Sequence, residues 1–306
     1  MQNIVYVLLF LTTLIWGGNA VAGKLAVGHV SPFMLTTLRW ILAVLILLPF
    51  AIRPLRRDWP VIRKNLPLMA VLGVLGFTLF NASFYTALNY TSAVNVSIEQ
   101  GAIPMVIIAL NFLLFRIRAT ALQLAGFVLS LIGIALTASH GDISRLAELD
   151  INTGDLFMLL AVVFYGTYTV ALRFKPDVHW LSTITVLATS ALLASLPFVA
   201  WEHASDRLIL PDTQGWLVVA YTALGPSILS QVLYIRGNEL IGANRAGLFV
   251  NLVPIFGTLL SIAILGEVFE PHHAIALVLV FCGIGLAEYS GRKAASMSAR
   301  VRASVD

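Results

Sequence analysis

Amide, hydroxyl and aromatic side chains recur at helical spacing inside long apolar stretches of this 306-residue sequence. One series advances in steps of three and four through Asn244, Gly247, Asn251, Pro254, Thr258 and Ser261. Shorter series are Trp16, Asn19 and Gly23; Thr78, Asn81 and Tyr85; Tyr165 and Tyr168; and Ser227, Gln231, Tyr234 and Asn238. Because residues at such intervals lie above one another on a helix, each series predicts a polar stripe.

Two interpretations of these stripes are open. Small and polar side chains join neighbouring helices in membrane bundles through hydrogen bonds of about 0.6–2 kcal/mol. Alternatively, the stripes face a wet cavity that binds a small solute. The amides of Asn81, Gln231 and Asn251 favour the cavity, since each primary amide has four hydrogen-bonding positions to satisfy. Aromatic faces beside amide dipoles suit a zwitterion that carries an apolar side chain.

Charged residues also lie within apolar stretches, at Lys24, Arg39 and Glu99. A charge at membrane depth is costly, so such residues are either paired or functional. A Glu99–Arg39 or Glu99–Lys24 ion pair would stabilise the outer part of the bundle. In the functional interpretation, Glu99 binds the ammonium group of a substrate or carries a coupled proton.

We expect eleven residues to form a substrate site: Trp16, Asn19, Thr78, Asn81, Tyr85, Glu99, Tyr165, Tyr168, Gln231, Tyr234 and Asn251. Gating or structural roles are expected for Lys24, Arg39, Pro104, Pro254 and Glu267. Pro104 and Pro254 fall within apolar stretches at equivalent places, where proline removes a backbone donor and bends a helix. They are either hinges that bend as gates open or static kinks.

Other motifs do not extend to a cofactor or metal site. Residues 18–24, Gly-Asn-Ala-Val-Ala-Gly-Lys, resemble a phosphate-binding loop, but Leu25 replaces the required Ser or Thr and the run lies within an apolar stretch. His272 and His273 are adjacent, so they cannot share a helix face as metal ligands. No nucleophile–base motif is present. We therefore expect no cofactor, no metal and no enzymatic activity.

The elements that position these residues are predicted to be membrane-spanning helices. The chain is 59% hydrophobic and 11% charged, whereas soluble domains are about 25% charged. A helix needs about 20 apolar residues to cross the bilayer. Ten stretches meet this need within a few residues: 4–27, 32–52, 67–89, 93–115, 120–138, 153–173, 181–201, 214–236, 243–265 and 272–290. The sequence therefore predicts an all-α integral membrane protein.

The basic residues predict the orientation, because Lys and Arg favour cytoplasmic loops. If the N-terminus is inside, nearly all of the 19 basic residues fall in cytoplasmic loops or the tail, and the outside loops hold only Arg145 and Arg207. Both termini are thus expected in the cytoplasm, with the protein in the cell (inner) membrane. This asymmetry also explains the pI of about 9.4 without a nucleic-acid partner. The expected partners are the lipid bilayer and a small-molecule substrate; the sequence specifies no oligomeric state.

An internal repeat links the ten stretches. A shift of about 150 residues places Asn81 on Gln231 and Pro104 on Pro254. We expect a first five-helix repeat over 1–145, a second over 150–290 and a basic cytoplasmic tail over 291–306. Because five is odd, the second copy is inverted, and inverted halves around a central cavity are typical of secondary transporters.

The chain resembles an EamA-type member of the drug/metabolite transporter superfamily over essentially residues 1–290. The resemblance rests on Trp16-Gly17 with Lys24, Arg39-Trp40, residues 251–254 (Asn-Leu-Val-Pro), residues 265–267 (Leu-Gly-Glu) and Gly283. The first half departs from it, with Arg116-Ile117 where the second half has Gly266-Glu267.

More narrowly, the chain is similar to bacterial amino-acid exporters, including the aromatic type. This resemblance implies ten helices, a central cavity and the export of amino acids of broad range by alternating access. The alternatives are a carrier of another metabolite, drug or nucleotide-sugar on the same fold, or a channel.

Overall fold

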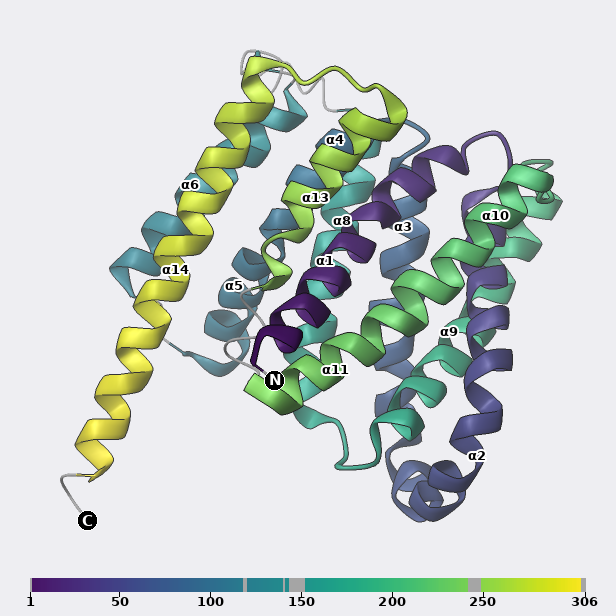
Figure 1. Cartoon of the computed structure of the whole chain (residues 1–306), viewed down its shortest axis with the longest axis horizontal. Helices are drawn as coiled ribbons and strands as arrows, with labels where there is room; N and C mark the ends of the chain where they lie inside the picture. Colours follow the sequence, from purple (N-terminus) through teal and green to yellow (C-terminus); the bar gives the residue numbers. More distant parts are fainter. Residues whose placement is uncertain (1, 118–119, 140, 143–151, 242–248, 304–306) are drawn as a thin grey trace.

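The computed structural model describes residues 2–117, 120–139, 141–142, 152–241 and 249–303. Every regular element within these ranges is a helix (Figure 1). The α-helices are α1 (Gln2–Leu25), α2 (Pro32–Gly73), α3 (Phe80–Ala87), α4 (Ala93–Glu99), α5 (Ile103–Phe115), α6 (Ala121–Ala138), α8 (Thr153–Ala171), α9 (Trp180–Ala204), α10 (Thr213–Thr222), α11 (Ser230–Ile241), α13 (Val253–Leu260) and α14 (Pro271–Ala303). Short 3₁₀ segments are η2 (Gln100–Ala102) and η3 (Leu172–Phe174), and π-helical segments are η1 (Val74–Leu79), η4 (Ala223–Leu229) and η5 (Ser261–Leu265).

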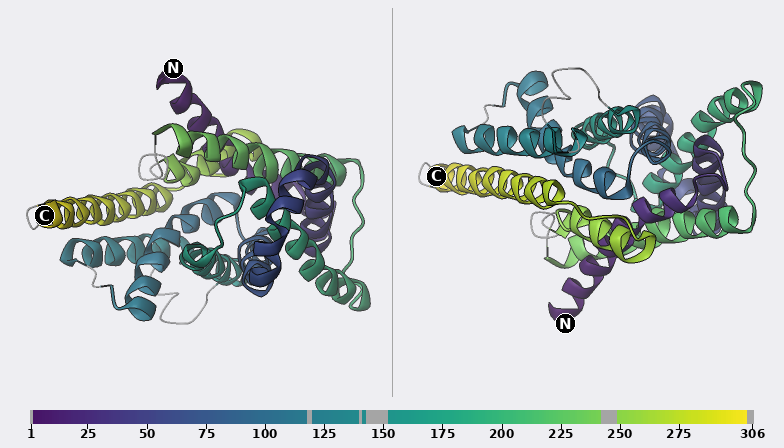
Figure 2. Two further views of the ribbon diagram at one scale, coloured as in Figure 1. Left: turned by 90° about the horizontal axis from the view of Figure 1, so that it is seen from below. Right: turned by 90° about the horizontal axis from the view of Figure 1, so that it is seen from above.

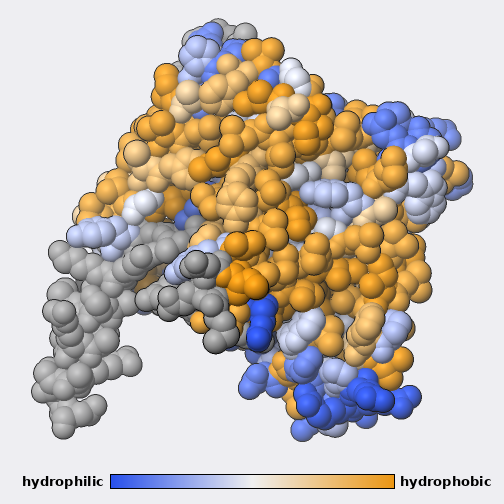
Figure 3. Space-filling model, viewed as in Figure 1, coloured by the Kyte–Doolittle hydropathy of each residue, from blue (hydrophilic) through white to orange (hydrophobic). Residues whose placement is uncertain are grey.

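The helices form a multi-pass membrane protein. In the described part, seven continuous helices are long and apolar enough to cross a bilayer. One of them, Pro32–Ala87, contains two predicted stretches, and the apolar helices Val253–Leu265 and Pro271–Leu286 are shorter. Apolar residues cover the middle of the surface, while hydrophilic residues gather at its upper and lower ends (Figure 3). The arrangement of ten helices in two repeats stays a prediction.

The residues between the predicted stretches 32–52 and 67–89 do not form a loop. These residues belong to α2, which continues as a helix from Pro32 to Gly73. Four prolines lie within it, at Pro49, Pro54, Pro60 and Pro67. Prolines bend a helix where they remove a backbone donor, and α2 turns at the lower end of Figure 1. A polar connection between two membrane stretches can therefore be helical.

Helices that are distant in sequence pack in pairs. α2 lies against α9, α6 against α14, and α1 against both α11 and α13. Figure 2 shows α14 beside the α6 region, and Figure 1 shows the C-terminal end of α14 extending away from the other helices. Glycine permits two of these approaches. A Cβ at Gly17 would lie 2.7 Å from the backbone nitrogen of Gly257, and one at Gly133 would lie 2.8 Å from the Ala276 carbonyl oxygen. Such small residues let membrane helices approach closely.

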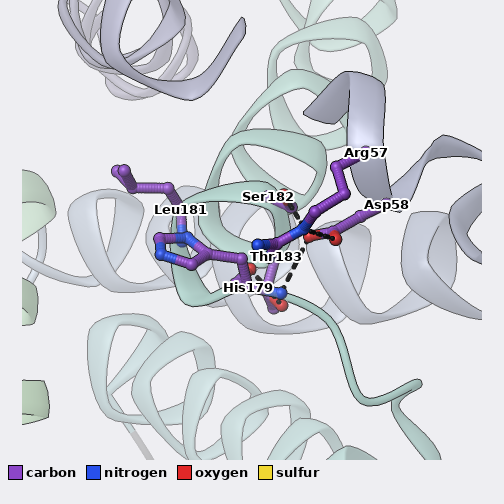
Figure 4. A network of polar contacts seen from close by, with 6 residues as sticks. All are labelled: Arg57, Asp58, His179, Leu181, Ser182 and Thr183. Carbon is purple, nitrogen blue, oxygen red and sulfur yellow. Dashed lines mark hydrogen bonds and ion pairs between the residues drawn. The ribbon is translucent and has the colours of Figure 1, made fainter. Parts of the chain in front are cut away.

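α2 and α9 cap each other in an antiparallel pair. At the start of α2, the Glu202 carboxylate of α9 accepts hydrogen bonds from the backbone N–H groups of Phe33 (2.9 Å) and Met34 (3.1 Å). At the start of α9, Asp58 of α2 accepts from the His179 backbone N–H (2.9 Å) and the Ser182 hydroxyl (2.7 Å), as Figure 4 shows. Each carboxylate supplies acceptors for otherwise unsatisfied N-terminal donors.

Departures from α-helical geometry occur at matching places in the two parts of the chain. The π-helical segment η1 precedes Asn81, and η4 precedes Gln231. Within η4, Pro226 has no N–H to offer the Thr222 carbonyl, and the Ser227 hydroxyl donates to that carbonyl instead (2.9 Å). π-helical segments inside α-helices often mark functional sites.

Candidate substrate cavity

A cavity of about 890 Å³ lies among α1, α2, α3, α5, α8, α11 and the start of α13. Eight of the eleven expected substrate residues line it: Trp16, Asn19, Asn81, Tyr165, Tyr168, Gln231, Tyr234 and Asn251. Arg39, Pro104 and Pro254, expected to have gating or structural roles, line it as well. The three amides singled out by their spacing therefore face one shared space.

Arg39 forms the polar centre of one cavity wall. Its Nε donates to the Ser227 hydroxyl (2.5 Å), and its Nη1 donates to Asn81 Oδ1 (2.7 Å) and the Tyr85 hydroxyl (2.5 Å). Asn19 Oδ1 lies 3.5 Å from the same Nη1 and accepts from the Tyr85 hydroxyl at 3.0 Å. The network connects α1, α2, α3 and the η4 segment around one guanidinium group.

Aromatic rings form the apolar part of the cavity lining. Trp40 stacks on Phe77 with ring centroids 4.6 Å apart, and Phe77 lies 5.8 Å from Tyr168. Tyr165 contacts both Tyr168 (5.4 Å) and Phe80 (4.9 Å). In the same lining, the ring centroids of Trp16 and Tyr234 are 5.3 Å apart, and the indole N–H of Trp16 donates to the Pro226 carbonyl (3.2 Å). Such rings offer apolar contact area with defined geometry.

Several lining residues lie outside the set expected from sequence: Trp40, Phe77, Phe80, Gln100, Thr169 and Ser227. Trp40 directly follows Arg39, and Phe77 precedes Asn81 by one helical turn. The spacing argument could therefore have included Phe77 but not Trp40, because adjacent residues on a helix do not share a face. The sequence did not single out these two apolar residues, because it does not distinguish a ring that lines a cavity from a ring that faces lipid.

Thr78 and Tyr85 do not line the cavity, although both were expected there. The Thr78 hydroxyl donates to the Ala191 carbonyl of α9 (3.0 Å), so Thr78 joins two helices as the packing interpretation proposed. Tyr85 is fully buried and reaches the cavity through its hydrogen bonds to the lining residues Arg39 and Asn19.

Glu99 does not form either of the expected ion pairs. Arg39 bonds to the neutral groups above, and Lys24 Nζ donates to the carbonyls of Leu88 (2.9 Å) and Thr91 (2.8 Å). Glu99 is fully buried outside the cavity lining, and neither of its carboxyl oxygens has a hydrogen-bond partner among the described residues. It lies near enough to Asp155 of α8 to interact electrostatically. α4 therefore turns Glu99 toward α8, away from α2.

Lys24 and Glu267 hold the corner between α3 and α4 from two sides. Lys24 binds carbonyls at the end of α3 and in the turn. The two Glu267 oxygens each accept from the start of α4, from the N–H groups of Ala93 and Val94 (both 2.8 Å). Glu267 follows Gly266, which has a φ of +67° that suits glycine. The Leu-Gly-Glu sequence thus supplies a turn and a helix cap.

Pro104 lies within the continuous helical span Ala93–Phe115, at the start of α5, whereas Pro254 begins the helix α13. Pro104 lies in the first turn of α5 after the 3₁₀ segment η2, and Pro254 lies in the first turn of α13 after a turn at Asn251-Leu252. Proline is favoured there because its missing N–H would have no intrahelical partner. At Pro104 a 3₁₀ segment therefore lies within one helical span, whereas Pro254 marks the start of a helix at the cavity wall.

The long stripe from 244 to 261 divides between two roles. Asn244 and Gly247 lie outside the described residues, while Asn251 and Pro254 line the cavity. Thr258 is buried outside the lining, and the Ser261 hydroxyl donates to the Gly257 carbonyl (2.7 Å) within its own helix. Among the described members of the stripe, only Asn251 and Pro254 line the cavity.

The EamA-like transporter family model matches this chain twice, over residues 3–139 and 152–288. The uncharacterized transporter YyaM of Bacillus subtilis is 28% identical over 281 residues, covering 92% of each chain. YetK of the same organism, also an uncharacterized transporter, is 28% identical and covers 91% of this chain and 85% of the relative.

Two further comparisons agree with these matches. The uncharacterized inner membrane transporter YicL of Salmonella typhimurium is 24% identical, covering 93% of this chain and 95% of the relative. One solved crystal structure has the same fold, with a TM-score of 0.62 at 21% identity over 95% of this chain and 98% of the other. The family resemblance seen in the sequence is confirmed, and the chain belongs to the EamA-like transporter family.

Proposed function

We propose that this transporter exports amino acids of broad range, aromatic ones included, by alternating access. The cavity is the observation that carries the proposal. It presents amides at Asn81, Gln231 and Asn251 together with the rings of Tyr165 and Tyr168. Its volume of about 890 Å³ lies within the range of about 300–1,000 Å³ that is typical of small-molecule sites.

Alternating access requires parts of the wall that can change shape. At the cavity, α5 begins at Pro104 after the 3₁₀ segment η2, and α13 begins at Pro254 after a turn. The π-helical segments η1 and η4 adjoin the same space through Gly76 and Ser227. Broken helices at a central site are a recurring feature of secondary transporters. The two matches of one family model to this chain support two repeats related by inversion.

The proposed location is the cell (inner) membrane, with both termini in the cytoplasm. The basic residues expected in the inside loops support this orientation. The Salmonella relative, which carries the description of an inner membrane transporter, supports the location.

Uptake into proteoliposomes tests the proposal most directly. The purified full chain is reconstituted and offered a panel of labelled amino acids, with and without a pH gradient. We expect saturable uptake of several members, among them phenylalanine or leucine. Empty liposomes provide the background. Uptake of nucleotide-sugars or drugs in place of every amino acid would refute the proposed substrate class.

Counterflow separates a carrier from a channel. Liposomes preloaded with unlabelled substrate should accelerate the entry of labelled substrate, because an alternating-access site returns loaded. A channel gives unsaturable flux with no stimulation by preloading, and that result would refute alternating access.

A further inference from the structure

The guanidinium group of Arg39 is a buried charge without an opposite charge. The residue is 5% exposed, and its four hydrogen-bond partners are the neutral oxygens of Ser227, Asn81, Tyr85 and Asn19. No carboxylate lies within ion-pair distance of it in the described part of the chain. An unpaired charge at membrane depth is expensive and marks a functional site.

One end of this guanidinium group remains available. Nε and Nη1 make all of its hydrogen bonds to described residues, and Nη2 makes none. Nη2 is absent from the fully enclosed atoms that lack a partner, and Arg39 lines the cavity. Two N–H donors of a fixed cation therefore face the space where a solute would bind.

The surroundings orient this donor pair and select the charge of its partner. The guanidinium carbon lies 5.1 Å from the ring centroid of Trp40, which holds the planar group by cation–π attraction. Arg39 is the sole charged residue in the described cavity lining. A carboxylate would complete the hydrogen bonding and neutralise the charge, and planar guanidinium–carboxylate pairing is among the strongest charge-assisted contacts. An amine without a carboxylate would leave the guanidinium group unpaired and add a second positive charge to the cavity.

We propose that Arg39 binds the carboxylate group of the transported solute through Nη2. Asn19, Asn81, Tyr85 and Ser227 are positioning residues that hold the guanidinium group. This inference rests on the proposed function and restricts its substrates to molecules with a carboxylate: amino acids as zwitterions and organic acids, but not the corresponding amines.

Three ligands that share one side chain test the inference on the purified wild-type protein. They are phenylalanine, 3-phenylpropionate, which lacks the amine, and phenethylamine, which lacks the carboxylate. Thermal stabilisation in detergent and competition against the counterflow of labelled phenylalanine or leucine are measured. We expect the first two ligands to stabilise and compete, and phenethylamine to need a concentration about 10–100 times higher, as for the loss of one charge-assisted contact.

Variants then assign the effect to the residue. Arg39→Gln should remove the preference for 3-phenylpropionate over phenethylamine, while Arg39→Lys should retain part of it. Arg57→Gln is the matched control, because Arg57 belongs to the same helix but is exposed and bonded to Asp58. The wild-type ligand series remains decisive if an Arg39 variant fails to fold.

The outcomes separate the inference from the proposed function. Equal competition by phenethylamine and phenylalanine would overturn the role of Arg39 and leave amino-acid transport intact. Arg39-dependent stabilisation by 3-phenylpropionate without transport of any amino acid would overturn the proposed function and support the carboxylate site. If no amino acid is transported and 3-phenylpropionate gives no Arg39-dependent stabilisation, the proposed function and the carboxylate site are both overturned.

Discussion

The reciprocal capping of α2 and α9 leads to a prediction about stability at Glu202. This carboxylate is buried, with 3% exposure, and accepts the backbone N–H groups of Phe33 and Met34 and the Ser31 hydroxyl (2.7 Å). In Glu202→Gln, one acceptor oxygen becomes an NH₂ group that cannot accept a hydrogen bond. At least one backbone donor at the start of α2 then loses its partner.

The magnitude follows from these losses. A buried donor without a partner costs about 1–3 kcal/mol, and loss of a negative charge at a helix N-terminus costs about 0.3–1 kcal/mol. We therefore expect Glu202→Gln to lower the free energy of unfolding by about 1–4 kcal/mol. At about 2–4 °C per kcal/mol, the apparent melting temperature should fall by at least about 2 °C.

The assay is thermal unfolding of the purified protein in one detergent. Asp206→Asn is the matched control, because it removes a charge nearby from an exposed residue with a φ of +55°, which asparagine tolerates. Asp58→Asn, at the opposite end of the helix pair, should destabilise less, because the His179 N–H and the Ser182 hydroxyl both donate to Oδ2 and the asparagine oxygen can take that place. The double variant should add the two effects because the sites share no partner. If Glu202→Gln has the same melting temperature as Asp206→Asn, the capping argument is refuted.

Three further predictions concern gating, proton coupling and pH. Replacing Pro104 and Pro254 with Ala should slow counterflow several-fold if the chain bends at these two places during transport, and unchanged counterflow would remove the gating role. Glu99→Gln should leave the half-saturating substrate concentration nearly unchanged, since Glu99 does not line the cavity; a rate and pH dependence equal to wild type in proteoliposomes would exclude proton coupling there. Hydrogen bonds from the Gly215 N–H and from His29 lower the pKa of Asp212 at the start of α10. The Asp212 carboxylate should therefore stabilise the fold at any pH above the ordinary pKa of a carboxyl group. This stabilisation should disappear as the pH falls through the lowered pKa. Unfolding of wild type and Asp212→Asn at near-neutral and strongly acidic pH checks this, and a difference that persists in acid would contradict it.

The sequence by itself predicted that the chain lies in a lipid bilayer and which face of each helix is polar. Apolar stretches long enough to span a bilayer predicted a multi-pass membrane protein, and steps of three and four placed Asn81, Gln231 and Asn251 on the polar sides of their helices. Both inferences depend on local geometry alone, on helix length and on side-chain periodicity. For that reason they needed no knowledge of neighbouring helices.

Tertiary packing decided which polar residues meet and which solute they can reach. Thr78 and Asn81 belong to one stripe, yet Thr78 bonds to α9 while Asn81 faces the cavity. Glu99 lies near Asp155, and Arg39 meets four neutral oxygens. Periodicity defines a face to within about one residue in each turn, but the rotation of each helix against its neighbours follows from how side chains interlock between helices. The partners of a buried charge are therefore properties of the packed bundle.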